Sequence, residues 1–385
     1  MEKSMSYPLA IIQPKKKLHE RVEELLSHAD IQINGRRPWD ITVYDDDFYI
    51  RTIRSGSLGL GETYMEGMWD SPRLDECIYR IMKAKLHEKV HSFVDVICFL
   101  QARLMNLQSS GRAYEVGEHH YDMDNGLYRK MLDKRMIYSC GFWKHAASLD
   151  EAQEAKLEMI CRKLVLKPGM RVLDIGCGWG GMAQFAAENY GVEVVGITIS
   201  REQVAVAKER CAGLPVDIRL QDYRNLNERF DRILSIGMFE HVGYKNYRTY
   251  MKKVHELLDE DGLFLLHTIG ANVSTTHCDP WFDKYIFPNG MLPSVSQISE
   301  TIEDLFVMED WHNFGADYDK TLVAWFNNFD QQWPHLKEKY DDRFYRMWKY
   351  YLLSFAGAFR ARHTQLWQIV LSPNGVAGGY MAHYK

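Results

Sequence analysis

The chain has 385 residues, 46% hydrophobic and 26% charged, and these ordinary globular values exclude a disordered or fibrous protein and predict two or three domains. The formal net charge of −5 is uneven, because residues 121–330 carry a net −8 and residues 331–385 a net +5. The acidic middle disfavours a nucleic-acid partner, whereas the basic end, rich in aromatic residues, predicts either contact with an anionic surface or a core-facing helix with a solvated basic face.

Local patterns also bear on the cellular compartment. No apolar run approaches the roughly 18 residues that span a bilayer, and the N-terminal residues lack the apolar core of an export signal. The seven cysteines are scattered without a C-x-x-C pair, which is typical of a reducing compartment. We therefore expect a cytoplasmic protein. His119 and His120 are adjacent candidates for metal ligands, but neighbouring side chains point apart on most backbones, so we predict no metal site.

The first hundred residues predict a small, mainly helical domain. In chain order, the patterns favour a helix at 17–29, strands at 41–44 and 48–51, a glycine-rich stretch at 55–67 and a long helix at 74–107. A polar, histidine-rich segment then separates this region from one with a different pattern of strands and helices. We predict an N-terminal domain of residues 1–107, a linker at 108–125 and a second domain of residues 126–385.

The second domain alternates strands with helices. The predicted strands are 171–175, 193–198, 217–221, 231–236, 263–268 and, last, 366–371. Predicted helices at 180–189, 201–212 and 245–258 occupy three of the four intervals between the first five strands. Such alternation is typical of parallel βαβ units. It predicts an α/β fold with a doubly wound, Rossmann-like sheet and a ligand site at the carboxyl ends of its strands.

A glycine turn joins the first of these strands to its helix. Gly176, Gly178 and Gly181 satisfy G-x-G-x-x-G, a pattern that lets the backbone approach a ligand at a helix N-terminus. Asp174 before the turn suits a cationic ligand, and the second strand ends without the acidic residue that binds the ribose of NAD. The turn instead resembles motif I of S-adenosylmethionine-dependent methyltransferases.

Further motifs narrow this resemblance. The run YSCG at 138–141, LDIGCGWGG at 173–181, GITIS-x-x-Q at 196–203, GMFEHVG at 237–243, HTI at 267–269 and ADY at 316–318 occur in this order. Together they resemble the family of cyclopropane-fatty-acyl-phospholipid and mycolic acid cyclopropane synthases. This likeness implies methylene transfer from S-adenosylmethionine to a cis double bond of a phospholipid acyl chain. It also implies a homodimer, peripheral at the inner face of the cell membrane.

The resemblance implies a set of residues around the methyl donor, contributed by the Tyr-Ser pair, the glycine turn, the T-x-S-x-x-Q segment and the end of the third strand. These residues are Tyr138, Ser139, Asp174, Gly176, Cys177, Gly178, Thr198, Ser200, Gln203, Asp222 and Tyr223. In this family, the glutamine takes the place of the acidic ribose ligand of many methyltransferases.

The resemblance also implies a bound bicarbonate ion that acts as the base. Its ligands would be Cys140, Glu240, His267, Tyr318 and the main chain of Ile269, with Glu240 accepting the bicarbonate hydroxyl. The adjacent His241 has a weaker claim as a core residue. Methyl transfer to an alkene leaves a carbocation, and aromatic faces stabilise such a charge. The aromatic candidates are Phe142, Trp143, Phe239, Trp281 and Phe282.

Membrane contact would need local cations, because the chain lacks a membrane span. The candidates are Lys15, Lys16 and Lys17, the pair Arg36 and Arg37, and the basic C-terminal segment, each facing anionic headgroups. Three other functions remain open. They are methyl transfer to a soluble molecule or as a branch on lipid, lipid binding without catalysis, and methylation of nucleic acid.

Overall fold

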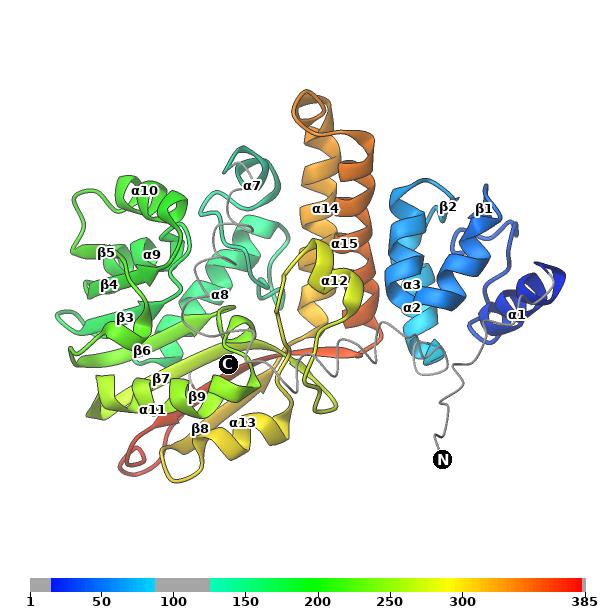
Figure 1. The fold of residues 1–385 in the computed structure, drawn as a ribbon. Coiled ribbons are helices and arrows are strands. Elements are labelled where there is room, and N and C mark those ends of the chain that lie inside the picture. Colours follow the sequence, from blue (N-terminus) through cyan, green and yellow to red (C-terminus); the bar gives the residue numbers. More distant parts are fainter. Residues whose placement is uncertain (1–14, 87–124, 383–385) are drawn as a thin grey trace, which may run out of the picture.

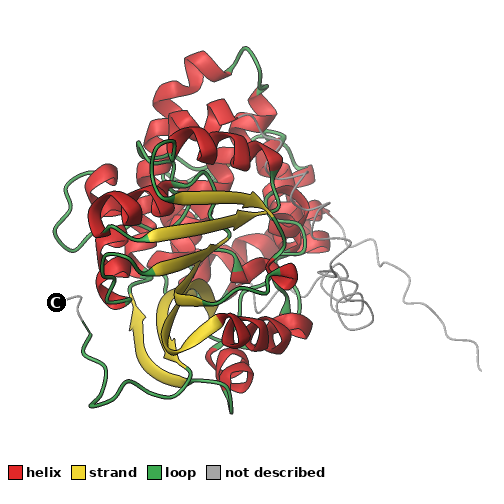
Figure 2. Cartoon of the chain, turned by 90° about the vertical axis from the view of Figure 1, so that its left-hand side faces the viewer, coloured by secondary structure: helices red, strands yellow, loops and turns green. Residues whose placement is uncertain are grey.

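The computed structural model describes residues 15–86 and 125–382 of the chain, and its main sheet has seven strands (Figures 1 and 2). The strand order is β5-β4-β3-β6-β7-β9-β8, and β9 runs antiparallel to both of its neighbours whereas the other pairs are parallel. The strands are β3 (Arg171–Ile175), β4 (Glu193–Thr198), β5 (Val216–Leu220), β6 (Phe230–Ile236), β7 (Leu258–Ala271), β8 (Val307–Asn313) and β9 (Thr364–Ser372).

Helices before and between the strands cover the two faces of the sheet, so the predicted doubly wound fold is confirmed. These helices are α8 (Leu149–Lys163), α9 (Gly181–Tyr190), α10 (Arg201–Arg210), α11 (Tyr247–Leu257) and α13 (Val295–Ile302). Chain order reverses between β3 and β6, which are neighbours in the sheet. In open α/β sheets the ligand site lies at such a switch point, beyond the carboxyl ends of the strands.

A second group of helices lies beside the sheet (Figure 1). It consists of α7 (Asn125–Met131), α12 (Pro280–Tyr285), α14 (Ala316–Leu336) and α15 (Asp342–Arg360). The paired helices α14 and α15 stand between the sheet and the N-terminal elements. The latter are α1 (Lys15–Ser27), β1 (Thr42–Val43), α2 (Asp47–Met65), β2 (Trp69–Asp70) and α3 (Leu74–Lys83).

The N-terminal part packs closely on α15. A Cβ at Gly357 of α15 would lie 2.5 Å from the backbone oxygen of Asp75 in α3, so only glycine fits at this contact. Arg346 of α15 donates to the backbone oxygens of Tyr64 and Trp69 and forms a 3.0 Å ion pair with Asp70. These contacts join residues far apart in sequence. The predicted boundary at 108–125 lies largely in a segment outside the described residues, so the division into domains stays a prediction.

Two predicted elements in this part are wrong. Residues 48–51 were expected as a strand but belong to α2, where the neighbouring side chains of Phe48 and Tyr49 are both buried, as a helix allows and an alternating strand does not. The long helix predicted at 74–107 ends at Lys83, because Lys85 adopts a left-handed backbone with φ 53°. The rest of that prediction, like His119 and His120, lies outside the described residues.

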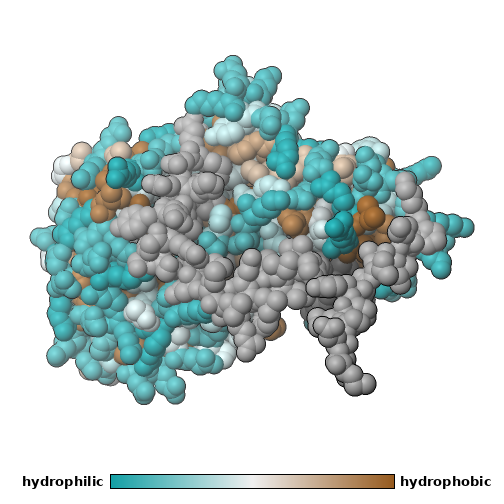
Figure 3. Space-filling view, viewed as in Figure 1, coloured by the Kyte–Doolittle hydropathy of each residue, from teal (hydrophilic) through white to brown (hydrophobic). Residues whose placement is uncertain are grey.

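Two of the cations predicted to face a membrane form ion pairs within the protein instead. Arg360 pairs with Asp319 and Asp75, each at 2.8 Å, and Arg37 donates to Asp40, so these two side chains are engaged within the protein. Most aromatic residues of α15 are buried or half-buried, in keeping with a core-facing helix. Within residues 15–86 and 125–382, no helix has the length and apolarity to cross a bilayer. On the face seen in Figure 3, hydrophobic residues form small patches among hydrophilic ones.

Candidate active site

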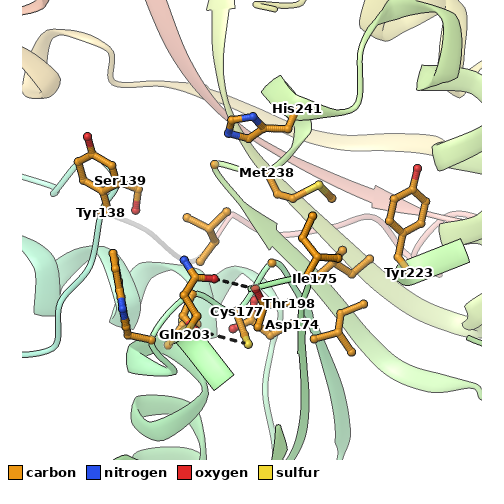
Figure 4. A pocket seen from close by; sticks show the side chains of 18 of the residues that line it. Tyr138, Ser139, Asp174, Ile175, Cys177, Thr198, Gln203, Tyr223, Met238 and His241 are labelled. Atoms are coloured by element: carbon orange, nitrogen blue, oxygen red, sulfur yellow. Dashed lines mark hydrogen bonds between the residues drawn. The ribbon is translucent and has the colours of Figure 1, made fainter. Parts of the chain in front are cut away.

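A cavity opens at the carboxyl ends of β3, β4, β5 and β6, at the switch point of the sheet. Its wall contains ten of the eleven residues predicted to surround the methyl donor, namely Tyr138, Ser139, Asp174, Gly176, Cys177, Gly178, Thr198, Gln203, Asp222 and Tyr223. Tyr138 and Ser139 lie on one side of the cavity and Tyr223 on the other, with Thr198 and Gln203 between them (Figure 4). The predicted residues therefore come together from four separate segments of the chain.

The glycine turn brings its backbone to the cavity. Gly176 and Gly178 have positive φ angles of 83° and 54°, which other residues rarely adopt. A Cβ at Gly176 would lie 2.9 Å from the Cβ of Met238, whereas a Cβ at Gly178 would meet no atom within 4 Å. A side chain at Gly178 would thus be free to occupy the space beside the loop.

Polar contacts fix the second strand end. The Thr198 hydroxyl donates to Oε1 of Gln203 over 2.7 Å, which leaves the two amide hydrogens of Gln203 available to other acceptors. Ser200 lies outside the cavity wall and caps α10, because its hydroxyl accepts the backbone N–H of Gln203. Its contribution is to start the helix that carries Gln203.

At the third strand end, the Asp222 carboxylate is already engaged. It accepts from the side chain of Arg224, which also lines the cavity, and from the Arg224 backbone N–H. The ring of Tyr223 packs edge-on against buried Tyr250 at 5.1 Å between centroids. Both predicted residues therefore have fixed positions in the wall.

Asp174 is the buried acid at the base of the cavity. Burial raises the pKa of its carboxyl to about 7, and its Oδ2 has no hydrogen-bond partner among the described residues. A carboxylate in this state suits a cationic group that enters the cavity.

Sequence reasoning missed or underrated three residues of this wall. Lys156 and Phe287 were not considered, and His241 was favoured as a core residue, yet all three line the cavity. Burial lowers the pKa of His241 to about 4, so the ring is neutral near pH 7. Phe287 lies 5.3 Å from the His241 ring, centroid to centroid. Lys156 sits on a helix, where a lone lysine normally indicates solvent, so no local signal marked it.

The predicted anion ligands lie next to this cavity rather than in its wall. Glu240 follows β6, and its Oε1 accepts the backbone N–H of Ile269 on β7 over 2.7 Å. Burial raises the pKa of Glu240 to about 7, although the Ile269 N–H and the Thr268 hydroxyl oppose that rise. Its Oε2 is buried and has no hydrogen-bond partner among the described residues. This oxygen can therefore accept a hydrogen bond that no described residue donates.

His267 provides the complementary group. It lies two residues before Ile269 on β7, so the two side chains share one face of the strand. Its Nδ1 lies 3.2 Å from Nε2 of Gln368 on β9, a residue that sequence reasoning missed. With the Gln368 amide donating, Nδ1 accepts and Nε2 carries the proton. Nε2 is buried and, within the described residues, has no partner.

Cys140 and Tyr318 complete the predicted set, and Thr321 makes polar contacts with the segment that contains Cys140. The Thr321 hydroxyl accepts from the backbone N–H of Gly141 at 3.1 Å and from the Trp143 indole at 2.9 Å, and lies 3.8 Å from the Cys140 sulfur. Burial raises the pKa of Tyr318, one turn earlier on α14, and the nearby ionisable groups of Tyr351, Cys140 and Glu240 add to that rise. Burial also raises the pKa of the Cys140 thiol, so the sulfur is protonated.

The aromatic candidates separate into different surroundings. Phe239 stacks on Tyr247 within the core of the sheet, and Trp281 packs on Gly61 of α2, with its Nε1 3.3 Å from the Met65 sulfur. Phe282 lies 5.3 Å from Phe287, between centroids. None of the five aromatic candidates lines the cavity, so their expected role beside a cation stays a prediction.

Known proteins share this sequence and this fold. The sequence model described as mycolic acid cyclopropane synthetase matches residues 108–369. The chain is 57% identical over 357 residues to the cyclopropane-fatty-acyl-phospholipid synthase of Escherichia coli strain K12, covering 92% of this chain and 93% of that relative. The structure of the cyclopropane synthase MmaA2 from Mycobacterium tuberculosis matches with a TM-score of 0.63 and 30% identity, over 67% of this chain and 97% of that chain. The mycolic acid cyclopropane synthase CmaA1, complexed with SAH and CTAB, matches with a TM-score of 0.62 and 31% identity over the same shares.

Proposed function

The chain belongs to the mycolic acid cyclopropane synthetase family, and from that premise we propose that it converts a cis double bond of a phospholipid acyl chain into a cyclopropane ring, with S-adenosylmethionine as the methyl donor. The observation that carries this proposal is the cavity at the strand ends, next to which the buried groups of Glu240 and His267 lie without partners among the described residues. A binding site for the donor and a polar site for proton removal are both requirements of this reaction.

The donor would lie in the cavity against the glycine turn. Gln203, whose two amide hydrogens bind no acceptor among the described residues, and the fixed ring of Tyr223 would contact the nucleoside. Tyr138 and Ser139 would face the amino-acid part. S-adenosylmethionine supplies an electrophilic methyl group on a sulfonium sulfur. The residues of the chain orient that group and exclude water from it.

The reaction requires no base before methyl transfer, because an alkene attacks with its π electrons. One carbon of the double bond gains the methyl carbon, the sulfur–methyl bond breaks, and the second carbon is left with a positive charge. Loss of one proton from the new methyl group lets its C–H electron pair close the three-membered ring. Phe287, which lines the cavity, and Phe282 beside it would offer aromatic faces to stabilise this charge.

We propose that bicarbonate is held by Glu240, His267, Ile269, Tyr318 and Cys140, and it would supply the weak base for that proton. The two buried atoms without partners among the described residues fit such an ion, since Glu240 Oε2 accepts from a hydroxyl and His267 Nε2–H donates to an oxygen. The neutral state of His267, whose pKa burial holds well below its usual value, keeps Nε2 a single donor. These residues hold and orient the ion.

The decisive experiment incubates the full chain with S-adenosylmethionine and vesicles of unsaturated phospholipid, followed by mass analysis of the released fatty acids. We expect an acyl mass gain of about 14, with the double bond lost and without a methyl branch. A methyl-branched product would indicate a lipid methyltransferase that does not close the ring. No change on lipid, together with methylation of a soluble acceptor, would contradict the proposal.

We propose that the N-terminal residues 1–107 handle the lipid and that the chain works as a homodimer at the inner membrane face. Lys16, Lys17 and Arg36 are exposed cations of this part, whereas Arg37 is engaged with Asp40. Changing these three cations to glutamate should weaken binding to vesicles with anionic headgroups and leave binding to neutral vesicles unchanged. Equal binding of both proteins to anionic vesicles would exclude these cations, and sedimentation of the wild type would test the dimer.

A further inference from the structure

A lysine without exposed surface lies in the wall of the donor cavity. Lys156 on α8 has a relative exposure of 0%, and its Nζ donates to the hydroxyl oxygen of Ser139 over 2.8 Å. Among the described residues no carboxylate forms an ion pair with it. Burial of an unpaired ammonium group is costly, and burial lowers the pKa of Lys156 to about 8. Asp133 and Asp174 are near enough for their charges to oppose this fall in pKa, but neither forms an ion pair with Lys156.

A second lysine on the same helix shows the usual solution. Lys163 lies seven residues later on α8, is equally buried, and pairs with Asp310 over 3.0 Å. Lys163 is not part of the cavity wall. The contrast indicates that Lys156 differs because of its place beside the cavity.

The contact with Lys156 fixes what Ser139 presents to the cavity. An ammonium group only donates, so its hydrogen bond occupies a lone pair of the Ser139 oxygen. The Ser139 hydroxyl hydrogen is then free to point elsewhere, and within the described residues no acceptor binds it. The wall at Ser139 therefore offers a hydrogen-bond donor with a positive charge directly behind it. Such a pair recognises an anionic oxygen.

Asp174 offers the opposite kind of group, a hydrogen-bond acceptor. Its buried Oδ2 has no partner among the described residues, and it lines the same cavity. Lys156 and Asp174 are near enough for each charge to act on the other's pKa, although they form no ion pair. A cavity with a donor pair at one point and an acceptor at another matches an α-amino acid group, which carries both a carboxylate and an ammonium.

We propose that Lys156 and Ser139 together recognise the carboxylate of the amino-acid part of S-adenosylmethionine, with Lys156 as a positioning residue that acts through Ser139. This inference rests on the proposed function, since it assumes that donor. The ligand carboxylate supplies a negative charge at Ser139, behind which Lys156 forms no ion pair with any described residue.

The test compares ligands with and without the carboxylate, by calorimetry on the full chain. The ligands are S-adenosylhomocysteine, its decarboxylated amine analogue and 5′-methylthioadenosine. We expect Lys156→Met to weaken S-adenosylhomocysteine by about tenfold or more and the two ligands without carboxylate by less than about twofold. Lys163→Met is the matched control and should keep the wild-type ratio between the ligands, whatever its effect on thermal stability.

Each outcome separates the hypotheses. An equal loss for all three ligands would make Lys156 a structural support of the 138–140 segment, and an unchanged affinity for S-adenosylhomocysteine would also overturn the proposal. If Lys156→Met fails to fold, Ser139→Ala tests the same pair and should selectively weaken the ligand with the carboxylate. Failure of the wild type to bind S-adenosylhomocysteine would instead contradict the proposed function.

Discussion

The Oε1 oxygen of Glu240 accepts the backbone N–H of Ile269 at 2.7 Å, and this buried bond joins the 3-10 helix after β6 (Phe239–His241) to β7. The bond holds one carboxylate oxygen and leaves the other, Oε2, without a partner among the described residues. The fixed oxygen thus determines where the free one points. His267 lies on the same face of β7 as Ile269. Residues 267–269 therefore position both the acceptor, Glu240 Oε2, and the donor, His267 Nε2.

Glu240→Gln tests this arrangement. The amide oxygen can still accept from Ile269, but its NH₂ then replaces the free oxygen, so an acceptor becomes a donor. We expect turnover on lipid vesicles to fall by on the order of 10²-fold, with almost unchanged affinity for S-adenosylhomocysteine. Glu256→Gln, an exposed position, is the control. Removal of carbonate from the wild type should slow turnover reversibly, and full speed in its verified absence would contradict the bicarbonate proposal.

Turnover should also depend on pH through Glu240. Its pKa is raised to about 7 by burial, and the ionised form is the one that accepts hydrogen bonds at both oxygens. Turnover should therefore fall as the pH drops below about 7, and rise to a plateau above it. Asp174 titrates in the same range, so the rates must be measured at saturating donor. Glu240→Gln should lose this limb of the profile, and an identical limb in the variant would assign it to another group.

The local patterns predicted the parallel part of the fold well, since each strand and each helix of a βαβ unit carries its own periodicity. The glycine turn at Gly176 and Gly178 was recognisable because its conformation demands that residue type. The strand β8 (Val307–Asn313) was missed, because it is an edge strand with no fully buried residue and so no apolar alternation.

The groups missed at the site share one physical cause. Lys156 and Gln368 are polar residues whose burial depends on partners far away in the sequence, at Ser139 and His267. A lysine in a helix and a glutamine in a strand normally face solvent, so their local sequence carries no signal of burial. Such positions become visible only when the fold has brought the partners together.

Gln368 should act as a positioning residue for His267. Its amide lies 3.2 Å from Nδ1 and fixes which ring nitrogen carries the proton. Gln368→Met keeps the volume but removes the hydrogen bond, and we expect roughly a tenfold or greater fall in turnover through a misplaced donor. Affinity for S-adenosylhomocysteine should stay unchanged. Unaltered turnover in a folded variant would show that the ring orientation does not depend on this amide.

Gly357 should limit the stability of the contact between α15 and α3. A Cβ there would lie 2.5 Å from the backbone oxygen of Asp75 and 2.8 Å from the backbone nitrogen of Tyr79, and backbone atoms cannot rotate away. We expect Gly357→Ala to cost about 1–3 kcal/mol in the free energy of unfolding, and Gly357→Val more. Denaturant titration measures both. An equal stability of the two variants and the wild type would show that the helices separate without cost.

Gly178→Asp should abolish donor binding while the fold is retained. The position has a φ of 54°, and a Cβ there would have no atom within 4 Å, so a side chain would enter the cavity rather than the core. The carboxylate would occupy space where the backbone has to approach the ligand, and the left-handed backbone adds a modest strain. Gly169→Asp is the matched control, since that residue has a φ of 81° and equal open space but lies outside the cavity wall. Both variants should unfold at similar temperatures, yet only Gly178→Asp should lose the calorimetric signal of S-adenosylhomocysteine. Equal affinity in the two variants would move the donor away from the glycine turn.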